Sequence, residues 1–390
     1  MQYERVCIES LGYSLPQEVV TSDEIERRLG PAYERLRLPA GRLELMSGIR
    51  ERRFFPPGTL PSDVSKVSAR RALEASGLEP ERIGALIHGS VCRDVLEPAT
   101  ACAVHEAVGL GPNCVVHDVS NACLGILTGM VHVANMIELG QIEAGIVVGT
   151  ECGRTLVENT IRLLNEDASI TRRDVKQFVA SLTIGSASAA VLLCSSDVSR
   201  TGNRLLAARA VAHTDHNALC RSDGMDEFMR TDSEQLMRRG VAAAAETFDG
   251  LMGELGWQAG GIQKSVCHQV GSAHRKLLFD RLGLNPEIDF STFETLGNTG
   301  AAALPTTLAI AAEAGRLDRG DQLALMGIGS GINCQMLGVD WQEQRVSGGE
   351  WGAQEATDDV KKAAVNREAV PEPKMLKRQA LAKRVEHYEH

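Results

Sequence analysis

Short apolar runs alternate with longer amphipathic stretches along the first 341 residues, with glycine and proline between them. The runs ALIHGS from Ala85 and AGIVVGTE from Ala144 have the length and composition of buried strands. The segment ATACAVHEAVGL from Ala99 has helical spacing instead. Alternation of this kind is typical of a fold in which helices cover a sheet. We therefore predict a mixed α/β protein.

Two stretches of the chain contain the same order of elements. In the first, a strand and a helix lead to a strand ending in DVSNAC, an apolar helix and a third strand. In the second, the strand SVCHQV leads to a helical pattern, then GNTG, an apolar helix and the strand QLALMGIGSG. His88 and His268 lie 180 positions apart, as do Val147 and Gly327. The shared order predicts a duplicated α/β unit.

These patterns suggest three segments. We assign residues 1–200 to an N-terminal half and residues 201–341 to a C-terminal half. Residues 342–390 are rich in charge, Gly and Ala, which predicts a flexible tail.

Composition excludes several classes of function. The formal charge of -10, with no concentrated basic segment, argues against nucleic-acid binding. No apolar stretch is long enough for a membrane span, and the N-terminus does not resemble an export signal. The ten cysteines lie mostly in apolar runs without a C-x-x-C pair, so we expect free thiols in a reducing cytoplasm and no bound metal. An anionic substrate such as coenzyme A would need local cations, for which Arg221, Arg275 and Lys276 are candidates unless they are simply solvated.

Cys123 is the first candidate for chemistry, because it lies where a predicted strand passes into an apolar helix. The N-terminus of a helix favours a thiolate, so we expect a lowered thiol pKa and a nucleophile at this position. A small core residue is the alternative, and taken alone it is the commoner one.

Two further polar residues favour the nucleophile. His268 ends a predicted strand, and Asn298 lies in the glycine-bracketed turn GNTG. If the halves are pseudo-symmetric, both face Cys123, as thioester chemistry needs. The His268 ring and the Asn298 amide could then stabilise an enolate oxygen, and backbone N–H groups of Cys123, Ser330 and Gly331 are candidates for an oxyanion hole.

Four motifs then occur in a fixed order: DVSNACLG around Cys123, CHQVG around His268, LGNTGAAALP around Asn298 and the closing GIGSGIN. Together they resemble the ketoacyl synthase III branch of the thiolase superfamily, over residues 1–341. The resemblance implies the thiolase fold, with two pseudo-symmetric α/β halves in a five-layered αβαβα core. It also implies a homodimer, a Cys-His-Asn site, acyl-CoA or acyl-carrier protein as partner, and no further cofactor.

Within that branch the chain is most similar to the OleA-type enzymes, which join two acyl-CoA molecules head to head. The added resemblance lies in CRDVLEPATA, HNALCRSD, MRTDSEQL and GIGSGINCQM. It implies that Glu97 reaches into the partner's pocket as a base for condensation without decarboxylation. Without the resemblance, Glu97 would be taken for a solvated loop carboxylate.

One departure from the family pattern and four alternative functions remain open. Decarboxylating ketoacyl synthases carry HQAN, whereas this chain has His268, Gln269, Val270 and Gly271, which puts contacts to malonyl carriers in doubt. A decarboxylating synthase, an acyltransferase and a thioesterase are the alternative enzymes. A non-catalytic subunit is the alternative of another class, although such subunits usually lose the nucleophile.

Overall fold

The computed structural model describes residues 1–222 and 228–351. Apolar strands make up much of its interior. Within that part of the chain, eleven strands join in one hydrogen-bonded sheet. Five come from the first half of the chain: β1 (Val6–Leu15), β4 (Ile83–Gly89), β5 (Val115–Val119), β6 (Ala144–Glu151) and β7 (Ala187–Ser195). Five come from the second half: β8 (Arg204–Ala212), β11 (Lys264–Cys267), β12 (Asp289–Phe290), β13 (Asp321–Gly329) and β14 (Asn333–Trp341). The eleventh, β15 (Val346–Glu350), pairs with β1.

The strand order is the same in the two halves. From the centre outward, the first half runs β1, β7, β6, β4, β5, and the second runs β8, β14, β13, β11, β12. The directions also match, because the two outer pairs of each half are parallel and the two inner pairs are antiparallel. The predicted pseudo-symmetry is therefore confirmed at the level of topology.

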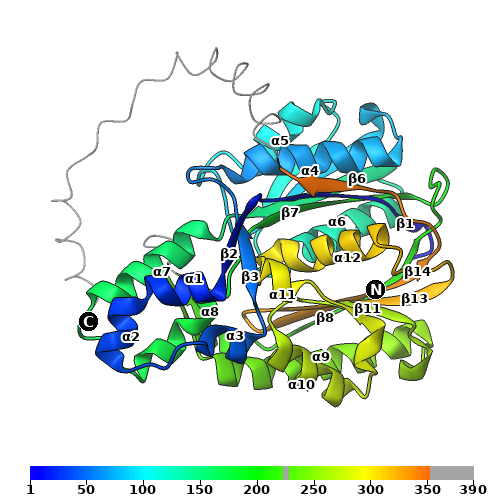
Figure 1. Cartoon of the computed structure of the whole chain (residues 1–390). Coiled ribbons are helices and arrows are strands. Elements are labelled where there is room, and N and C mark those ends of the chain that lie inside the picture. Colours follow the sequence, from blue (N-terminus) through cyan, green and yellow to red (C-terminus); the bar gives the residue numbers. More distant parts are fainter. Residues whose placement is uncertain (223–227, 352–390) are drawn as a thin grey trace, which may run out of the picture. The chain divides into compact units, whose positions relative to one another are not determined.

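Helices divide the molecule into five layers (Figure 1). The outer helices are α4 (Pro61–Ser76) and α5 (Thr100–Val108) over the first half, and α9 (Ser233–Leu255) and α10 (Ser272–Leu282) over the second. Between the halves lie α6 (Gly125–Glu138) and α12 (Ala303–Glu313), which pack on strands and are buried on most sides. A helix that is apolar nearly all round belongs in the interior, which explains the composition of both. The αβαβα arrangement is the one expected.

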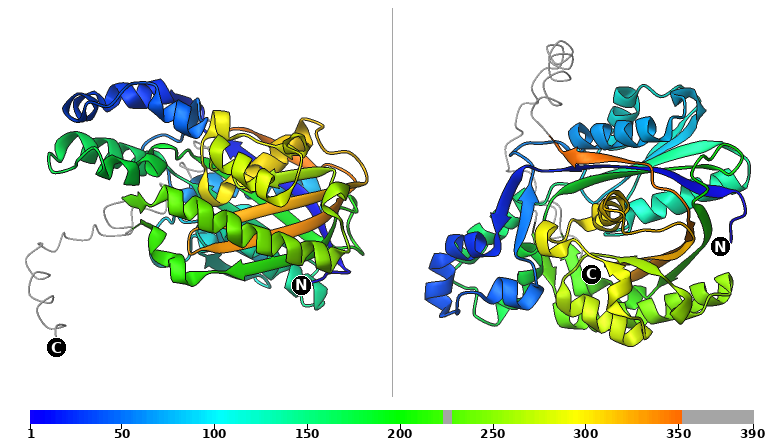
Figure 2. Two further views of the ribbon diagram at one scale, coloured as in Figure 1. Left: turned by 90° about the horizontal axis from the view of Figure 1, so that it is seen from below. Right: turned by 45° about the vertical axis from the view of Figure 1, so that its right-hand side comes forward.

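A helical region extends from one end of this core (Figures 1 and 2). It contains the antiparallel pair of β2 (Glu18–Thr21) and β3 (Glu51–Phe54) and the helices α1 (Ser22–Arg28), α2 (Gly30–Leu36), α3 (Arg42–Ser47), α7 (Arg154–Glu166) and α8 (Val179–Leu182). A separate apolar cluster, which includes Ile25, Leu29, Val157 and Ile161, holds these elements together. The polar segment after residue 150 therefore packs against the N-terminal helices, and α3 contacts α10. A short hairpin of β9 (Cys220–Ser222) and β10 (Met229–Thr231) flanks residues 223–227.

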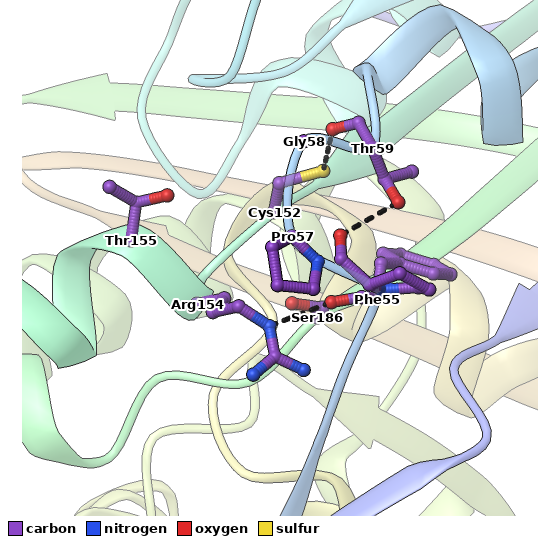
Figure 3. A pocket seen from close by; sticks show the side chains of 9 residues that line it. Phe55, Pro57, Gly58, Thr59, Cys152, Arg154, Thr155 and Ser186 are labelled. Carbon is purple, nitrogen blue, oxygen red and sulfur yellow. Dashed lines mark hydrogen bonds between the residues drawn. The ribbon is translucent and has the colours of Figure 1, made fainter.

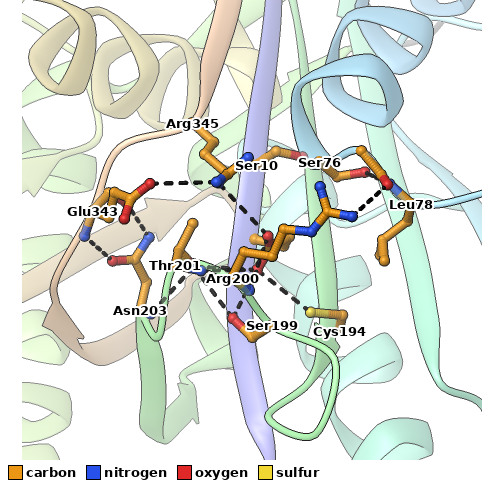
Figure 4. Close-up of polar contacts among 12 residues, drawn as sticks. Ser10, Ser76, Leu78, Cys194, Ser199, Arg200, Thr201, Asn203, Glu343 and Arg345 are labelled. Atoms are coloured by element: carbon orange, nitrogen blue, oxygen red, sulfur yellow. Dashed lines mark hydrogen bonds and ion pairs between the residues drawn. The ribbon is translucent and has the colours of Figure 1, made fainter.

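The junction between the halves is held by buried polar groups (Figure 4). Glu9 of β1 accepts hydrogen bonds from Ser199 Oγ at 2.7 Å and the Arg200 backbone N–H at 3.0 Å. Asn203 donates to the carbonyls of Ile8 at 3.1 Å and Glu343 at 2.7 Å. The first two contacts satisfy a carboxylate that is 1% exposed, and together with those of Asn203 they fix the crossover from β7 to β8 against β1.

The predicted start of the tail is wrong. Residues 342–351 belong to the core, because β15 pairs with β1 and Trp351 packs edge-on against Phe55 with 5.6 Å between ring centroids. The polar, glycine-rich run VSGGE lacks the alternation that would reveal a strand. Residues 352–390, the rest of the predicted tail, lie outside the described residues.

Candidate active site

Cys123 lies in a sharp turn between β5 and α6. β5 ends at Val119 and α6 begins at Gly125, and the turn is closed by a hydrogen bond of 2.9 Å from the Leu124 N–H to the Asn121 carbonyl. Ala122 adopts a left-handed backbone with φ of 45°, which a residue with a Cβ rarely does. Strain of this kind clusters at functional sites, and here the strained residue directly precedes Cys123.

The predicted lowering of the Cys123 pKa is wrong. Burial raises the pKa of this thiol to about 12, and the charges of Glu151 and Cys220 act in the same direction. The loss of solvation for the thiolate therefore outweighs the favourable helix N-terminus. Cys123 is protonated at neutral pH, so it can attack a thioester only as its proton is removed.

His268 directly follows β11 and is 6% exposed. Its backbone N–H donates to the Met326 carbonyl at 2.9 Å, which fixes it beside β13. Burial, together with His274, lowers the pKa of His268 to about 3, so the imidazole is neutral at physiological pH. The buried Nδ1 has no hydrogen-bond partner among the described residues. A neutral imidazole has one donor and one acceptor nitrogen, so the ring can either donate to or accept from a bound substrate.

Gln269 connects this histidine to the segment before Asn298. Its side-chain oxygen accepts hydrogen bonds from the backbone N–H groups of Thr292 at 2.8 Å and Phe293 at 3.1 Å, at the start of α11 (Phe293–Leu296). Two residues on, Gly271 has φ of 147°, and an added Cβ would lie 2.5 Å from the Ser47 carbonyl oxygen. No side chain fits there unless α3 moves, so an asparagine at 271 is sterically excluded.

Asn298 is held on both sides by backbone hydrogen bonds. Its N–H donates to the Thr183 carbonyl at 3.0 Å, and its carbonyl accepts from the Gly185 N–H at 2.9 Å. The side-chain oxygen accepts a hydrogen bond of 3.0 Å from the N–H of Gly300. Gly300 is the first residue of the short helix η6 (Gly300–Ala302). Because the oxygen is occupied, the amide NH2 remains as the group that can donate to a ligand.

Small residues let these elements approach one another. An added Cβ at Gly327 of β13 would lie 2.6 Å from Leu124 Cδ2, and one at Gly329 would lie 3.6 Å from the Cys123 backbone nitrogen. The end of β13 thus packs against the Cys123 turn, while His268 follows the neighbouring strand β11. Within the described residues, no side-chain hydrogen bond joins Cys123, His268 and Asn298 directly.

The turn that contains Ser330 and Gly331 connects β13 to β14 directly after Gly329. Both residues are half-buried, and Gly331 has φ of 139°. The predicted oxyanion donors therefore lie in a tight turn that continues from the strand packed against Cys123.

Glu97 lies apart from these residues. It is exposed on the loop between β4 and α5, and it has no hydrogen bond or ion pair within the part of the chain that the structure describes. The same loop exposes three apolar side chains, with exposed fractions of 51% for Val91, 52% for Val95 and 90% for Leu96. The structure of one protomer does not bring Glu97 to Cys123.

Glu151 is a residue that sequence reasoning missed. It is the last residue of β6, it is 6% exposed, and its charge acts on the Cys123 thiol. A carboxylate at the end of an otherwise apolar buried strand was the available signal in AGIVVGTE, since such strands rarely carry a charge.

Two cavities adjoin these elements. The larger, of about 180 Å³, is lined by residues of the Cys123 turn, β8 and β14: Asn121, Leu124, Ala210, Val211, Ala212, Asn333, Cys334 and Gln335. The smaller, of about 30 Å³, lies beside Cys152 and Arg154 (Figure 3). There the Cys152 thiol donates to the Thr59 carbonyl at 3.8 Å and Arg154 Nε donates to the Phe55 carbonyl at 2.8 Å.

Of the predicted cations, Arg275 forms a 2.7 Å ion pair with the buried Asp289, so its guanidinium is already engaged. Lys276 and Arg221 are exposed. Among the described residues, no group of three or more His, Cys, Asp or Glu side chains is arranged to hold a metal ion. In the same part of the chain, no helix has the length and apolar character needed to cross a membrane.

Two parts of the chain match models of known protein families. Residues 58–197 match the N-terminal domain of thiolase, and residues 252–341 match the C-terminal part of 3-oxoacyl-[acyl-carrier-protein] synthase III. An acyl-CoA:acyl-CoA alkyltransferase from Shewanella oneidensis is 41% identical over 351 residues, covering 87% of this chain and 100% of the relative. The chain belongs to the acyl-CoA:acyl-CoA alkyltransferase family.

Other relatives place this family within the thiolase fold. A crystal structure of OleA from Xanthomonas campestris with bound cerulenin has a TM-score of 0.84 and 34% identity, covering 87% of this chain and 98% of that one. A variant of the same OleA, solved with lauric acid and lauroyl-CoA, has a TM-score of 0.83, 34% identity and coverages of 87% and 100%. A β-ketoacyl-[acyl-carrier-protein] synthase III from Streptomyces coelicolor is 27% identical, covering 85% of this chain and 96% of the relative. The OleA-type alkyltransferases are thus more similar to this chain than that synthase is.

Proposed function

We propose that this protein joins two acyl-CoA molecules by a Claisen condensation without decarboxylation and that it releases a β-keto acid. The observation that carries the proposal is an OleA-type relative that is 41% identical over 87% of this chain and over its own whole length. We take the Cys123 thiol, the neutral His268 imidazole and the Asn298 amide as the reacting groups. Condensing chemistry needs a nucleophile to hold the first acyl group and hydrogen-bond donors for an enolate oxygen, and these residue types supply both.

In the first half-reaction, the Cys123 sulfur attacks the carbonyl of one acyl-CoA and coenzyme A leaves as its thiol. The thiol proton must be removed during the attack, because burial holds the Cys123 pKa at about 12. We assign the neutral ring of His268 as the relay: it takes the proton as the sulfur attacks and passes it to the departing coenzyme A sulfur, which therefore leaves as a thiol. Backbone N–H groups of Cys123 and of the Ser330–Gly331 turn stabilise the negative oxygen that forms.

In the second half-reaction, Glu97 removes a proton from the carbon next to the carbonyl of the second acyl-CoA. The His268 ring and the Asn298 amide donate to the enolate oxygen, and the enolate carbon attacks the acyl-cysteine. The new carbon-carbon bond expels the Cys123 thiolate, and the proton that Glu97 removed returns to that sulfur, so both residues regain their starting states. Hydrolysis of the resulting β-ketoacyl-CoA gives the β-keto acid and coenzyme A.

Glu97 requires a second copy of the chain in this proposal. Its loop exposes Val91, Val95 and Leu96, an apolar surface of the kind that marks protein contacts. β5 is the outermost strand of its half and exposes 46% of Val115, so a partner can pair there as well. We therefore assign a homodimer in which each protomer supplies Glu97 to the other. The ten free cysteines suit a cytoplasmic enzyme of lipid biosynthesis.

The alternatives have weaker support. A decarboxylating synthase would use malonyl-carrier protein and would not need Glu97; the steric exclusion of an asparagine at 271 disfavours it. An acyltransferase or a thioesterase would discharge the acyl-cysteine without a new carbon-carbon bond. Product analysis separates all three, because only condensation lengthens the carbon skeleton.

The test is Glu97→Gln, which keeps the shape of the side chain and removes the base. We expect acylation of Cys123 at the wild-type rate, because the first half-reaction does not use Glu97. We expect condensation to fall by roughly 10²- to 10⁴-fold, as for loss of a general base. Intact mass after incubation with a long-chain acyl-CoA measures acylation, and extraction of the β-keto product measures condensation.

Cys123→Ser is the control, in which no stable mass gain should occur. Co-expression of Cys123→Ser with Glu97→Gln then tests the dimer, because only a mixed dimer has one site with an intact cysteine and an intact glutamate. Recovery of condensation supports a glutamate supplied by the partner. Full condensing activity of Glu97→Gln alone would refute the assigned base.

A further inference from the structure

Glu151 is a buried carboxylate to which the mechanism above gives no role. It ends β6, is 6% exposed, and has no cationic partner among the described residues. Burying a carboxylate without a counter-charge is costly unless hydrogen bonds replace the lost water. The groups that supply those hydrogen bonds therefore indicate why the residue is there.

One oxygen of Glu151 connects two loops that are distant in sequence. Oε1 accepts hydrogen bonds from the backbone N–H of Val91 at 3.0 Å and from that of Ala301 at 3.2 Å. Val91 begins the exposed loop that carries Glu97, and Ala301 lies three residues after Asn298. A single carboxyl group thus bridges the loop of the proposed base and the segment of the proposed enolate donor.

Gly300 extends this contact to the Asn298 side chain. Its φ of 54° is left-handed, and an added Cβ would lie 2.9 Å from Cγ of Glu151, so the carboxyl group packs directly on this glycine. The Gly300 N–H is the donor that holds Asn298 Oδ1 at 3.0 Å. The Glu151 carboxyl group therefore packs on the residue whose N–H holds the Asn298 side chain.

Glu151 is unsuited to activating Cys123. Its negative charge raises the pKa of the Cys123 thiol, which opposes formation of the thiolate. Burial also raises the pKa of Glu151 itself. The contacts fit a group that organises its surroundings through accepted hydrogen bonds.

We propose that Glu151 is a positioning residue for the condensation half-reaction, because it holds the Asn298 segment and the start of the Glu97 loop in fixed register through one carboxyl oxygen. This inference rests on the proposed function. It predicts that the second half-reaction depends on Glu151 much more than acylation of Cys123 does.

The experiment compares Glu151→Ala, Glu151→Gln and wild type in both half-reactions. Glu151→Ala removes the acceptor of both N–H groups, so condensation should fall on the order of tenfold to hundredfold, as expected for misplaced reacting groups. Acylation of Cys123, followed by intact mass, should change by less than about threefold if the oxyanion donors stay in place. Glu151→Gln keeps an oxygen that can accept both hydrogen bonds, so it should recover most of the condensation rate.

Two further variants separate a specific effect on condensation from misfolding or general loss of stability. Glu151→Asp keeps the buried carboxylate but shortens the side chain by one carbon, and it should show the same selective loss if Glu151→Ala does not fold. Glu9→Asp is the matched control, because Glu9 is also a buried carboxylate that accepts backbone and hydroxyl hydrogen bonds, but it lies at the junction of the halves. It should lower the melting temperature and leave the ratio of the two half-reactions unchanged.

Three outcomes would overturn the proposal. Equal losses in both half-reactions, with a lower melting temperature, would show a structural role only. A Glu151→Gln variant as inactive as Glu151→Ala would show that the charge matters instead of the hydrogen bonds. Wild-type condensation in both Glu151→Ala and Glu151→Asp would show that the bridge is dispensable. Failure of the proposed function looks different, because wild type itself would then acylate without forming a longer product.

Discussion

His88 and His268 occupy corresponding places in the two halves, at the ends of β4 and β11, and their surroundings differ completely. His88 Nε2 lies 3.2 Å from Ser65 Oγ, which lies 2.7 Å from Thr150 Oγ1, and the chain of buried hydroxyls continues to Ser188. His268 makes no side-chain hydrogen bond within the described residues, and its Nδ1 is buried without a partner. The two halves thus share the backbone position, and they differ in whether polar neighbours occupy the imidazole.

The loops that precede the two central helices, α6 and α12, also match in position and differ in the residue that they carry. Cys123 lies between β5 and α6, and Asn298 lies between β12 and α12. Each loop contains a residue with a left-handed backbone, Ala122 with φ of 45° and Gly300 with φ of 54°. Two pseudo-equivalent loops therefore supply different groups to the proposed reaction, a nucleophile from one half and an amide donor from the other.

The sharpest test of the comparison replaces each histidine with alanine. His268→Ala should reduce condensation by about 10²- to 10³-fold, since it removes a donor to the enolate oxygen. His88→Ala should leave the rate within about threefold and lower the free energy of unfolding by about 2–4 kcal/mol through a cavity and a lost hydrogen bond. Condensation assays and urea unfolding measure the two effects.

His268→Ala should destabilise the protein less than His88→Ala does. The substitution also opens a cavity, but it removes a buried nitrogen without a partner, whose burial itself costs about 1–3 kcal/mol. If the two variants lose activity to the same extent, the halves are not functionally distinct and the comparison fails.

Acid should lower the folding stability through both histidines, despite their different roles. Burial is the main cause that lowers the pKa of His88 to about 4 and that of His268 to about 3, against about 6.5 in the unfolded chain. The unfolded state therefore binds more protons below pH 6.5, and stability falls as the pH drops from about 6.5 towards 4. Each shift corresponds to roughly 3–5 kcal/mol, and the full contribution is present only above pH 6.5.

Urea unfolding of wild type and His88→Gln at pH 7 and pH 4.5 measures this effect. The variant should lose less stability between the two pH values than wild type does, because it lacks one of the buried imidazoles. Equal losses would mean that His88 is not held neutral in the folded protein.

The sequence alone predicted the fold, the turn between a strand and a helix that holds Cys123 and the strand end before His268, because those depend on strand order and on short local motifs. That these residues and Asn298 form one site stays a prediction. It did not predict the Glu151 bridge, because its two donors lie 60 and 150 residues away along the chain. Similarly, β15 depends on pairing with β1 and not on its own alternation. The error in the Cys123 pKa has the same origin, because burial of the thiol is a tertiary property that the local helix start does not reveal.

The smallest expected effect concerns the two left-handed residues. Ala122→Gly relieves a conformation that costs an alanine roughly 1–2 kcal/mol, but glycine also gains about 0.4–1 kcal/mol of freedom in the unfolded chain. The net stability should therefore rise by no more than about 1.6 kcal/mol. The looser turn should slow acylation of Cys123 a few-fold, because the thiol is held less firmly in its attacking position.

Gly300→Ala is the matched change in the other half, and it should lower the folding stability that Ala122→Gly is expected to raise. The new Cβ would meet Cγ of Glu151 at 2.9 Å, in a backbone conformation that alanine disfavours, so stability should fall by about 1–3 kcal/mol. It should also slow condensation more than acylation, because it displaces the donor to Asn298. Melting temperatures and the two half-reaction rates of both variants separate these effects. Loss of acylation in Gly300→Ala, or of condensation alone in Ala122→Gly, would show that the two loops do not divide the reaction between them.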